Sequence, residues 1–182
     1  MFETPAVTIS SVRAYVVSAL AASLLACGSP GGGARAVHDA AEPTAAAASS
    51  HAWTATLDRD HPLVGRVFSV RRGRFVDERE VLGSLRGYVL LGEKHDNPDH
   101  HALQARILRA LVDAGRRPIV AFEMFDVDEQ ADIDAARRAS PRDARAIADA
   151  VDWERSGWPS FGYYAPIVQT ALDADLPIVA AG

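Results

Sequence analysis

One segment organises this sequence, and it reads Tyr88-Val89-Leu90-Leu91-Gly92-Glu93-Lys94-His95-Asp96-Asn97-Pro98-Asp99-His100-His101. A short apolar run, typical of a fully buried strand, breaks at Gly92 into a cluster of carboxylates and imidazoles, after which an amphipathic helix begins. In open α/β sheets, ligands bind outside the carboxyl ends of the parallel strands. We therefore expect the chemistry of this protein at Glu93 and His95.

The same pattern occurs a second time. Residues 118–122 form another apolar run, and Glu123 follows it directly. If the two strands are parallel neighbours, Glu93 and Glu123 face one crevice. Two carboxylates with histidines nearby suit a divalent metal, acid-base catalysis or an iron-containing cofactor, and these residues alone leave the three alternatives open.

A helix is expected from Asp99 to Ala114, and it carries two adjacent histidines. His100 lies three positions before Leu103 and seven before Ile107, so it shares their inward stripe. His101 belongs to a different face of this helix and is expected nearer the surface. His100 is therefore the better candidate ligand of the two.

The other predicted elements alternate between strands and helices. They are a hairpin at 67–70 and 74–76, a short helix ending at Leu85, helices at 129–138, 141–151 and 164–174, and a strand at 176–180. This order predicts an α/β fold with a parallel-sheet core and βαβ crossovers. Because Gly182 directly follows a buried-type strand, and a parallel sheet needs both faces covered, we expect the domain of residues 53–182 to be truncated at its C-terminus.

The N-terminal part of the sequence differs in character from this domain. Cys27 is the only cysteine, and it follows an apolar segment, residues 14–26, that is short for a membrane span. Residues 1–27 resemble a bacterial lipoprotein signal with Cys27 as the lipidated residue; the alternative is an ordinary secretory signal with a chance cysteine. Residues 28–52 are rich in Gly, Ala, Pro and Ser and are expected to form a disordered tether.

The charge of the chain bears on which kinds of molecule it can bind. The net charge is -5, and no basic stripe runs through the sequence, which argues against a nucleic-acid partner. Large apolar and aromatic side chains are instead concentrated near the chemistry-bearing motifs. Seven of them could wall a broad crevice: Phe122, Met124, Phe125, Trp158, Phe161, Tyr163 and Tyr164.

Four short motifs together resemble the ChaN-like haem-binding lipoproteins, which belong to the superfamily of the Tiki and TraB proteins and the erythromycin esterases. The motifs are residues 92–101, residues 121–125, Trp153 with Trp158-Pro159, and Tyr164-Ala165-Pro166-Ile167. The resemblance implies a lipid-anchored protein of the bacterial cell envelope, facing the periplasm or the cell surface. It also implies haem binding in iron acquisition, with the haem held between two protomers of a homodimer.

The resemblance further implies a tyrosinate ligand for the haem iron. Tyr164 best matches the motif, with Tyr163 adjacent, while His100 and Trp158 are further candidate contacts. From the residues alone, Tyr164 is open to a second interpretation. It shares a helical stripe with Ile167 and Val168 and could be a core residue whose hydroxyl bonds to a neighbour.

The wider superfamily suggests a second function. There, a glutamate and a histidine matching Glu93 and His95, with a second glutamate matching Glu123, form a catalytic or divalent-metal site. A metal-dependent hydrolase, either an esterase or a peptidase, is therefore the alternative to a haem-binding protein. The superfamily's second Gly-x-x-His element would lie after Gly182, so whether this chain is an enzyme is left open.

Overall fold

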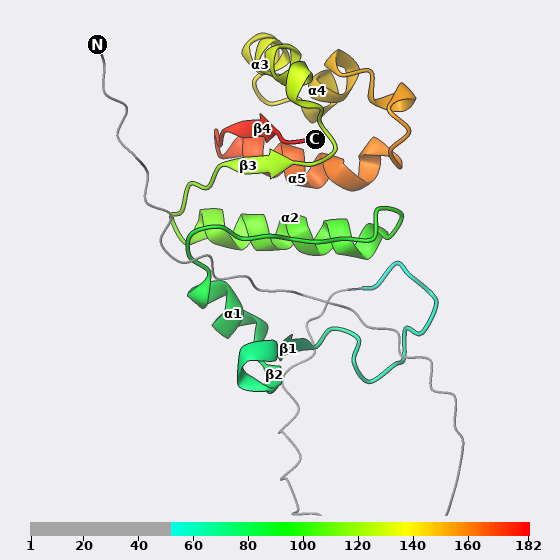
Figure 1. Cartoon of the computed structure of the whole chain (residues 1–182), viewed down its shortest axis with the longest axis vertical. Coiled ribbons are helices and arrows are strands. Elements are labelled where there is room, and N and C mark those ends of the chain that lie inside the picture. Colours follow the sequence, from blue (N-terminus) through cyan, green and yellow to red (C-terminus); the bar gives the residue numbers. More distant parts are fainter. Residues whose placement is uncertain (1–51) are drawn as a thin grey trace, which may run out of the picture.

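The computed structural model describes residues 52–182, in which the first strands form a small hairpin (Figure 1). Strand β1 (Val67–Ser69) pairs antiparallel with β2 (Arg74–Val76) across the 3-10 turn η1 (Val70–Arg72). Gly73 closes the turn with a φ of 62°, a left-handed conformation that glycine adopts at low cost. The predicted hairpin is confirmed.

Two capped helices follow the hairpin. Helix α1 (Glu78–Ser84) begins after Asp77, whose side chain accepts a hydrogen bond from the backbone N–H of Arg79. Helix α2 (Pro98–Asp113) begins after Asn97, whose side chain caps the N–H of Asp99 at 2.9 Å. Proline at the first helical position fits this start, because its missing N–H would have no partner within the helix.

The central sheet is a parallel pair. Strand β3 (Val120–Phe122) lies beside β4 (Ile178–Ala180), with Ala121 opposite Val179. The chain passes from β3 to β4 through a helical crossover made of η2 (Val127–Glu129), α3 (Gln130–Ala139), α4 (Ala144–Ala150), η3 (Trp153–Arg155) and α5 (Phe161–Asp173). The α/β class predicted from the sequence, with a parallel pair and a βαβ crossover, is confirmed.

The apolar run at residues 88–91 departs from the prediction of a buried strand. It is not assigned to a strand, and in the described part of the chain β3 pairs only with β4. Tyr88 and Leu90 are 81% and 71% exposed, whereas Val89 and Leu91 pack against a small apolar cluster. The run therefore buries only alternate side chains, and the prediction that it is a buried strand was wrong.

Helix α2 lies between two apolar clusters (Figure 1). One of its faces packs on α5 and the larger cluster through Leu108, while another packs on the smaller cluster through Ile107 and Leu111. The larger cluster joins β3, β4 and helices α3 to α5. Because α2 is shared by both clusters, it carries two buried stripes rather than one.

One further difference concerns an element boundary. The sequence predicted a helix from residue 141, but α4 begins at Ala144 and is capped by Asp143, whose side chain accepts from the N–H of Arg145 at 2.9 Å. Cys27 and nearly all of the predicted tether lie outside the described residues. Within residues 52–182, no helix is long and apolar enough to cross a membrane.

Candidate functional site

The carboxylate of Glu93 is the centre of a polar cluster in the interior. Its side chain is only 6% exposed. The Tyr164 hydroxyl donates a hydrogen bond to Glu93 Oε1 at 3.0 Å, and His95 Nδ1 lies 2.9 Å from the same oxygen. His101 Nδ1 lies 3.0 Å from the other oxygen, Oε2. We call Glu93, His95, His101 and Tyr164 the Glu93 cluster.

His101 corrects the sequence analysis. It was expected near the surface, yet it is fully buried, with Nε2 2.9 Å from the carbonyl oxygen of His95. The reason is the second stripe of α2: His101 lies seven positions before Leu108 and faces α5 with it.

The approach of His101 to Glu93 is close but poorly aligned. Within residues 52–182, neither His101 Nδ1 nor Glu93 Oε2 has a hydrogen-bond partner, although the two atoms are 3.0 Å apart. Both atoms are buried, and a buried polar atom without a hydrogen bond carries a desolvation cost. The Glu93 cluster is thus a buried polar site that is only partly satisfied.

His100 lies on the other side of α2. Its Nδ1 accepts a hydrogen bond from the backbone N–H of Lys94 at 2.8 Å. This bond fixes the turn between Glu93 and the start of α2. The structure therefore gives His100 a turn-stabilising contact, and it gives His101, rather than His100, the place beside Glu93.

Tyr164 is enclosed by aromatic rings and carboxylates. Its side chain is fully buried, and its ring lies 4.9 Å from Trp153 and 4.3 Å from His101. Burial raises the pKa of the Tyr164 hydroxyl well above its usual value, and the hydrogen bond to Glu93 together with the charges of Glu93 and Glu123 raises it further. The phenolate form of Tyr164 is strongly disfavoured here.

Glu123 follows β3 and is itself exposed. Its charge contributes to the raised pKa of Tyr164, so the two predicted carboxylates act on one hydroxyl group. Within residues 52–182, however, no group of three His, Cys, Asp or Glu side chains is arranged to hold a metal ion. Of the three residues predicted to hold a divalent metal, Glu93 and His95 are in contact at 2.9 Å, and the site with Glu123 stays a prediction.

The predicted aromatic wall is only partly present. Phe122, Phe125 and Phe161 are buried in the larger apolar cluster, which corrects the expectation that they wall an open crevice. Tyr163 and Trp158 remain half-buried at the border of the Glu93 cluster. The Tyr163 ring stacks on His101 at 5.6 Å, and Trp158 contacts His95 edge-on at 4.9 Å.

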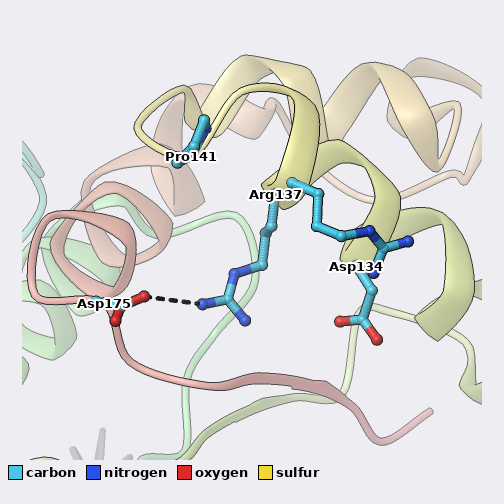
Figure 2. Close-up of a pocket in the computed structure, with 5 residues that line it drawn as sticks. Asp134, Arg137, Pro141 and Asp175 are labelled. Carbon is cyan, nitrogen blue, oxygen red and sulfur yellow. Dashed lines mark ion pairs between the residues drawn. The ribbon is translucent and has the colours of Figure 1, made fainter.

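A surface pocket of about 260 Å³ lies elsewhere, at the end of α3 (Figure 2). Arg137 reaches across it toward Asp175 at 3.9 Å and donates to the carbonyl oxygen of Leu176 at 2.8 Å. These contacts connect α3 to the turn before β4. The pocket is charged, slightly smaller than the roughly 300 Å³ at which ligand sites begin, and contains none of the predicted site residues.

Comparisons with known proteins point to one family. A family model described as haem-binding uptake, Tiki superfamily, ChaN, matches residues 84–182. A solved structure, described as cofacial heme binding to ChaN of Campylobacter jejuni, is similar with a TM-score of 0.51 and 24% identity, covering 61% of this chain and 46% of that one. At that identity the likeness shows the fold alone. The comparison with curated proteins finds no match.

Proposed function

The chain belongs to the ChaN family of haem-binding uptake proteins in the Tiki superfamily, and from this membership we propose that it binds haem and serves haem or iron uptake. The single observation that carries the proposal is the family match over residues 84–182, because this range holds the whole Glu93 cluster with Tyr163 and Trp158 at its border. The chain spans 46% of the length of the solved relative, so haem binding by that relative supports this proposal without establishing it.

The ligand in this proposal is a tyrosine, and the geometry favours Tyr163 over Tyr164. An iron-bound tyrosine is a phenolate, which suits ferric haem. Tyr164 is fully buried, donates its proton to Glu93 and has a raised pKa, so ionising it is costly. Tyr163 is half-buried, and within residues 52–182 its hydroxyl has no hydrogen bond to break.

The residues around Tyr163 fit a porphyrin edge. Trp158 is half-buried on the His95 side of the cluster, and the His95 side chain is 43% exposed. A planar aromatic cofactor could lie against Tyr163 and Trp158 without entering the core. Tyr164 would then hold the Glu93 side chain in place from the core side, through its hydrogen bond to the Glu93 carboxylate.

Haemin titration of three proteins tests this assignment. The parent is expected to give the Soret and charge-transfer bands of tyrosinate-ligated ferric haem. Tyr163→Phe should lose these bands and bind haemin about 10–100-fold more weakly or worse, the loss that even an outer-shell partner of a metal causes. Tyr164→Phe, the matched control, should keep the bands because its hydroxyl does not reach the iron.

The opposite pattern, with bands lost only in Tyr164→Phe, would assign the iron to Tyr164 and refute the choice of Tyr163. Identical spectra in all three proteins would remove tyrosine ligation altogether. Sedimentation velocity of the same samples checks the proposed homodimer. We expect haem to bring two copies together, in keeping with the cofacial haem described for the relative from Campylobacter jejuni.

Attachment to the cell envelope through Cys27 completes the proposal. Its support is the sequence alone: an apolar segment at residues 14–26 that ends in Ala26-Cys27-Gly28. We expect the bacterial protein to sediment with membranes and to yield a lipid-modified N-terminal peptide by mass spectrometry. Cys27→Ala should yield no such peptide. An unmodified Cys27 in the mature parent would refute lipid attachment and would leave the haem-binding proposal unaffected.

A further inference from the structure

The hairpin before α1 has a charge unlike the rest of the chain. Residues 61–76 contain four arginines and no acidic residue, although the whole chain has a net charge of -5. We call residues 61–76 the arginine hairpin. It precedes the range matched by the family model, which begins at residue 84, so family membership does not account for it.

Exposed apolar side chains are interspersed with these arginines. Val70, in the turn of the hairpin, is 74% exposed, and Leu63 and Phe68 are about half exposed, at 49% and 47%. Neither apolar cluster of the domain includes a residue of the arginine hairpin. In Figure 1 the two strands lie beyond α1, away from the β3–β4 pair.

Most of the arginine charge is not neutralised by acidic neighbours. Arg72 forms an ion pair with Glu80, and the Arg66 guanidinium lies 4.3 Å from the centre of the Phe75 ring. Within residues 52–182, Arg71 and Arg74 have no ion-pair partner. Two exposed arginines without an acidic partner therefore lie within four residues of the exposed Val70.

We propose that the arginine hairpin docks on an anionic lipid surface. Basic residues beside exposed aliphatic ones are the chemistry of an interfacial membrane contact: guanidinium groups meet the headgroup phosphates while Val70 and Leu63 enter the acyl boundary. Nucleic-acid surfaces offer aliphatic side chains no comparable environment, since single strands are bound by base stacking on aromatic rings. This docking is independent of haem binding and of a lipid on Cys27.

Vesicle co-sedimentation with the full-length chain carrying Cys27→Ala tests the proposal. Vesicles of equal parts phosphatidylglycerol and phosphatidylcholine are compared with vesicles of phosphatidylcholine alone. Because residues 14–26 are apolar and can associate with lipid themselves, the readout is the difference between hairpin variants and this parent. Arg71→Ser with Arg74→Ser removes two exposed charges, and Val70→Asp replaces the apolar residue in the turn.

The expected loss follows from the charge removed. Each basic residue near an anionic surface strengthens binding about fivefold, so the double arginine variant should bind phosphatidylglycerol vesicles roughly 30-fold more weakly. Val70→Asp should also weaken binding. Arg138→Ser with Arg142→Ser, which removes the same charge from two exposed positions elsewhere, should stay close to the parent. Added salt should weaken parent binding by screening.

Three results would overturn the proposal: equal binding of the parent to both kinds of vesicle, an equal loss in the Arg138 and Arg142 control, or an unaffected Val70→Asp. The last, combined with tight binding of the parent to double-stranded DNA, would identify a polyanion site and not a lipid one. Circular dichroism of each variant confirms that it is folded.

Discussion

Replacing Glu93 with alanine is expected to lower the free energy of unfolding by about 1–3 kcal/mol, the usual loss when a buried hydrogen-bond donor is left without its acceptor. Glu93 accepts the hydrogen bond of the Tyr164 hydroxyl at 3.0 Å and lies 3.0 Å from Nδ1 of the fully buried His101. Without the carboxylate, the Tyr164 hydroxyl remains buried with no acceptor in its place, and such a group costs about 1–3 kcal/mol. Urea denaturation monitored by fluorescence and circular dichroism measures the change.

Two further variants separate the effect of the hydrogen bond from Tyr164 to Glu93 from the effect of removing a carboxylate charge. Glu93→Gln keeps a carbonyl oxygen for the Tyr164 hydroxyl and should lose clearly less stability than Glu93→Ala. Glu154→Ala removes an exposed carboxylate that pairs with the exposed Arg145, and it should change stability by less than about 1 kcal/mol. If Glu93→Ala unfolds at the same urea concentration as the parent, or at a higher one, then Glu93 is not a stabilising centre of the fold.

Local pattern was enough to place most helices and strands. The cap at Asp77 and the apolar runs around Val120 and Ile178 are each signals within a few residues, and the helix expected to end at Leu85 and the two strands lie within three residues of their expected ends. A helix cap bonds to N–H groups of the first turn of its own helix, so the residues that predict the cap and the residues that it stabilises are neighbours in the sequence.

The run at residues 88–91 shows where local pattern fails. Its composition predicts a strand buried on both faces, but pairing depends on what lies beside the run, and here Val89 and Leu91 pack against the smaller apolar cluster instead. His101 shows the same limit. The sequence prediction gives α2 one inward stripe, whereas a helix shared by two apolar clusters needs two. The second stripe is visible in the sequence as Ala105, Leu108 and Val112, which extend from His101 along one face.

The centre of the candidate site was predictable, and its connections were not. A dense group of ionisable residues after an apolar run identifies Glu93 and His95 from the sequence. The bond from Tyr164 to Glu93 joins residues 71 positions apart, and no spacing rule reaches that far. Burial of Tyr164, together with this bond, raises the pKa of its hydroxyl, and that moves the proposed iron ligand to Tyr163.

Phe125→Ala is expected to lower the free energy of unfolding by about 3–5 kcal/mol, the usual cost of truncating a fully buried phenylalanine. Phe125 is 0% exposed, and its ring lies 5.2 Å from Phe122 and 5.8 Å from Trp153. Truncation leaves a cavity that these rings cannot fill without moving. Since domains of this size are stable by only about 5–15 kcal/mol, the urea midpoint should fall by a large fraction.

The same variant tests whether Phe125 belongs to the core or to a ligand wall. A core residue predicts lost stability with an unchanged haemin spectrum, as long as the titration is done well below the unfolding transition. The neighbouring Val127→Ala, at a position 64% exposed, should alter stability by less than about 0.5 kcal/mol and serves as the matched control. If Phe125→Ala retains the parent's stability but binds haemin more weakly, the ring faces the ligand, and the larger apolar cluster must open when haem binds.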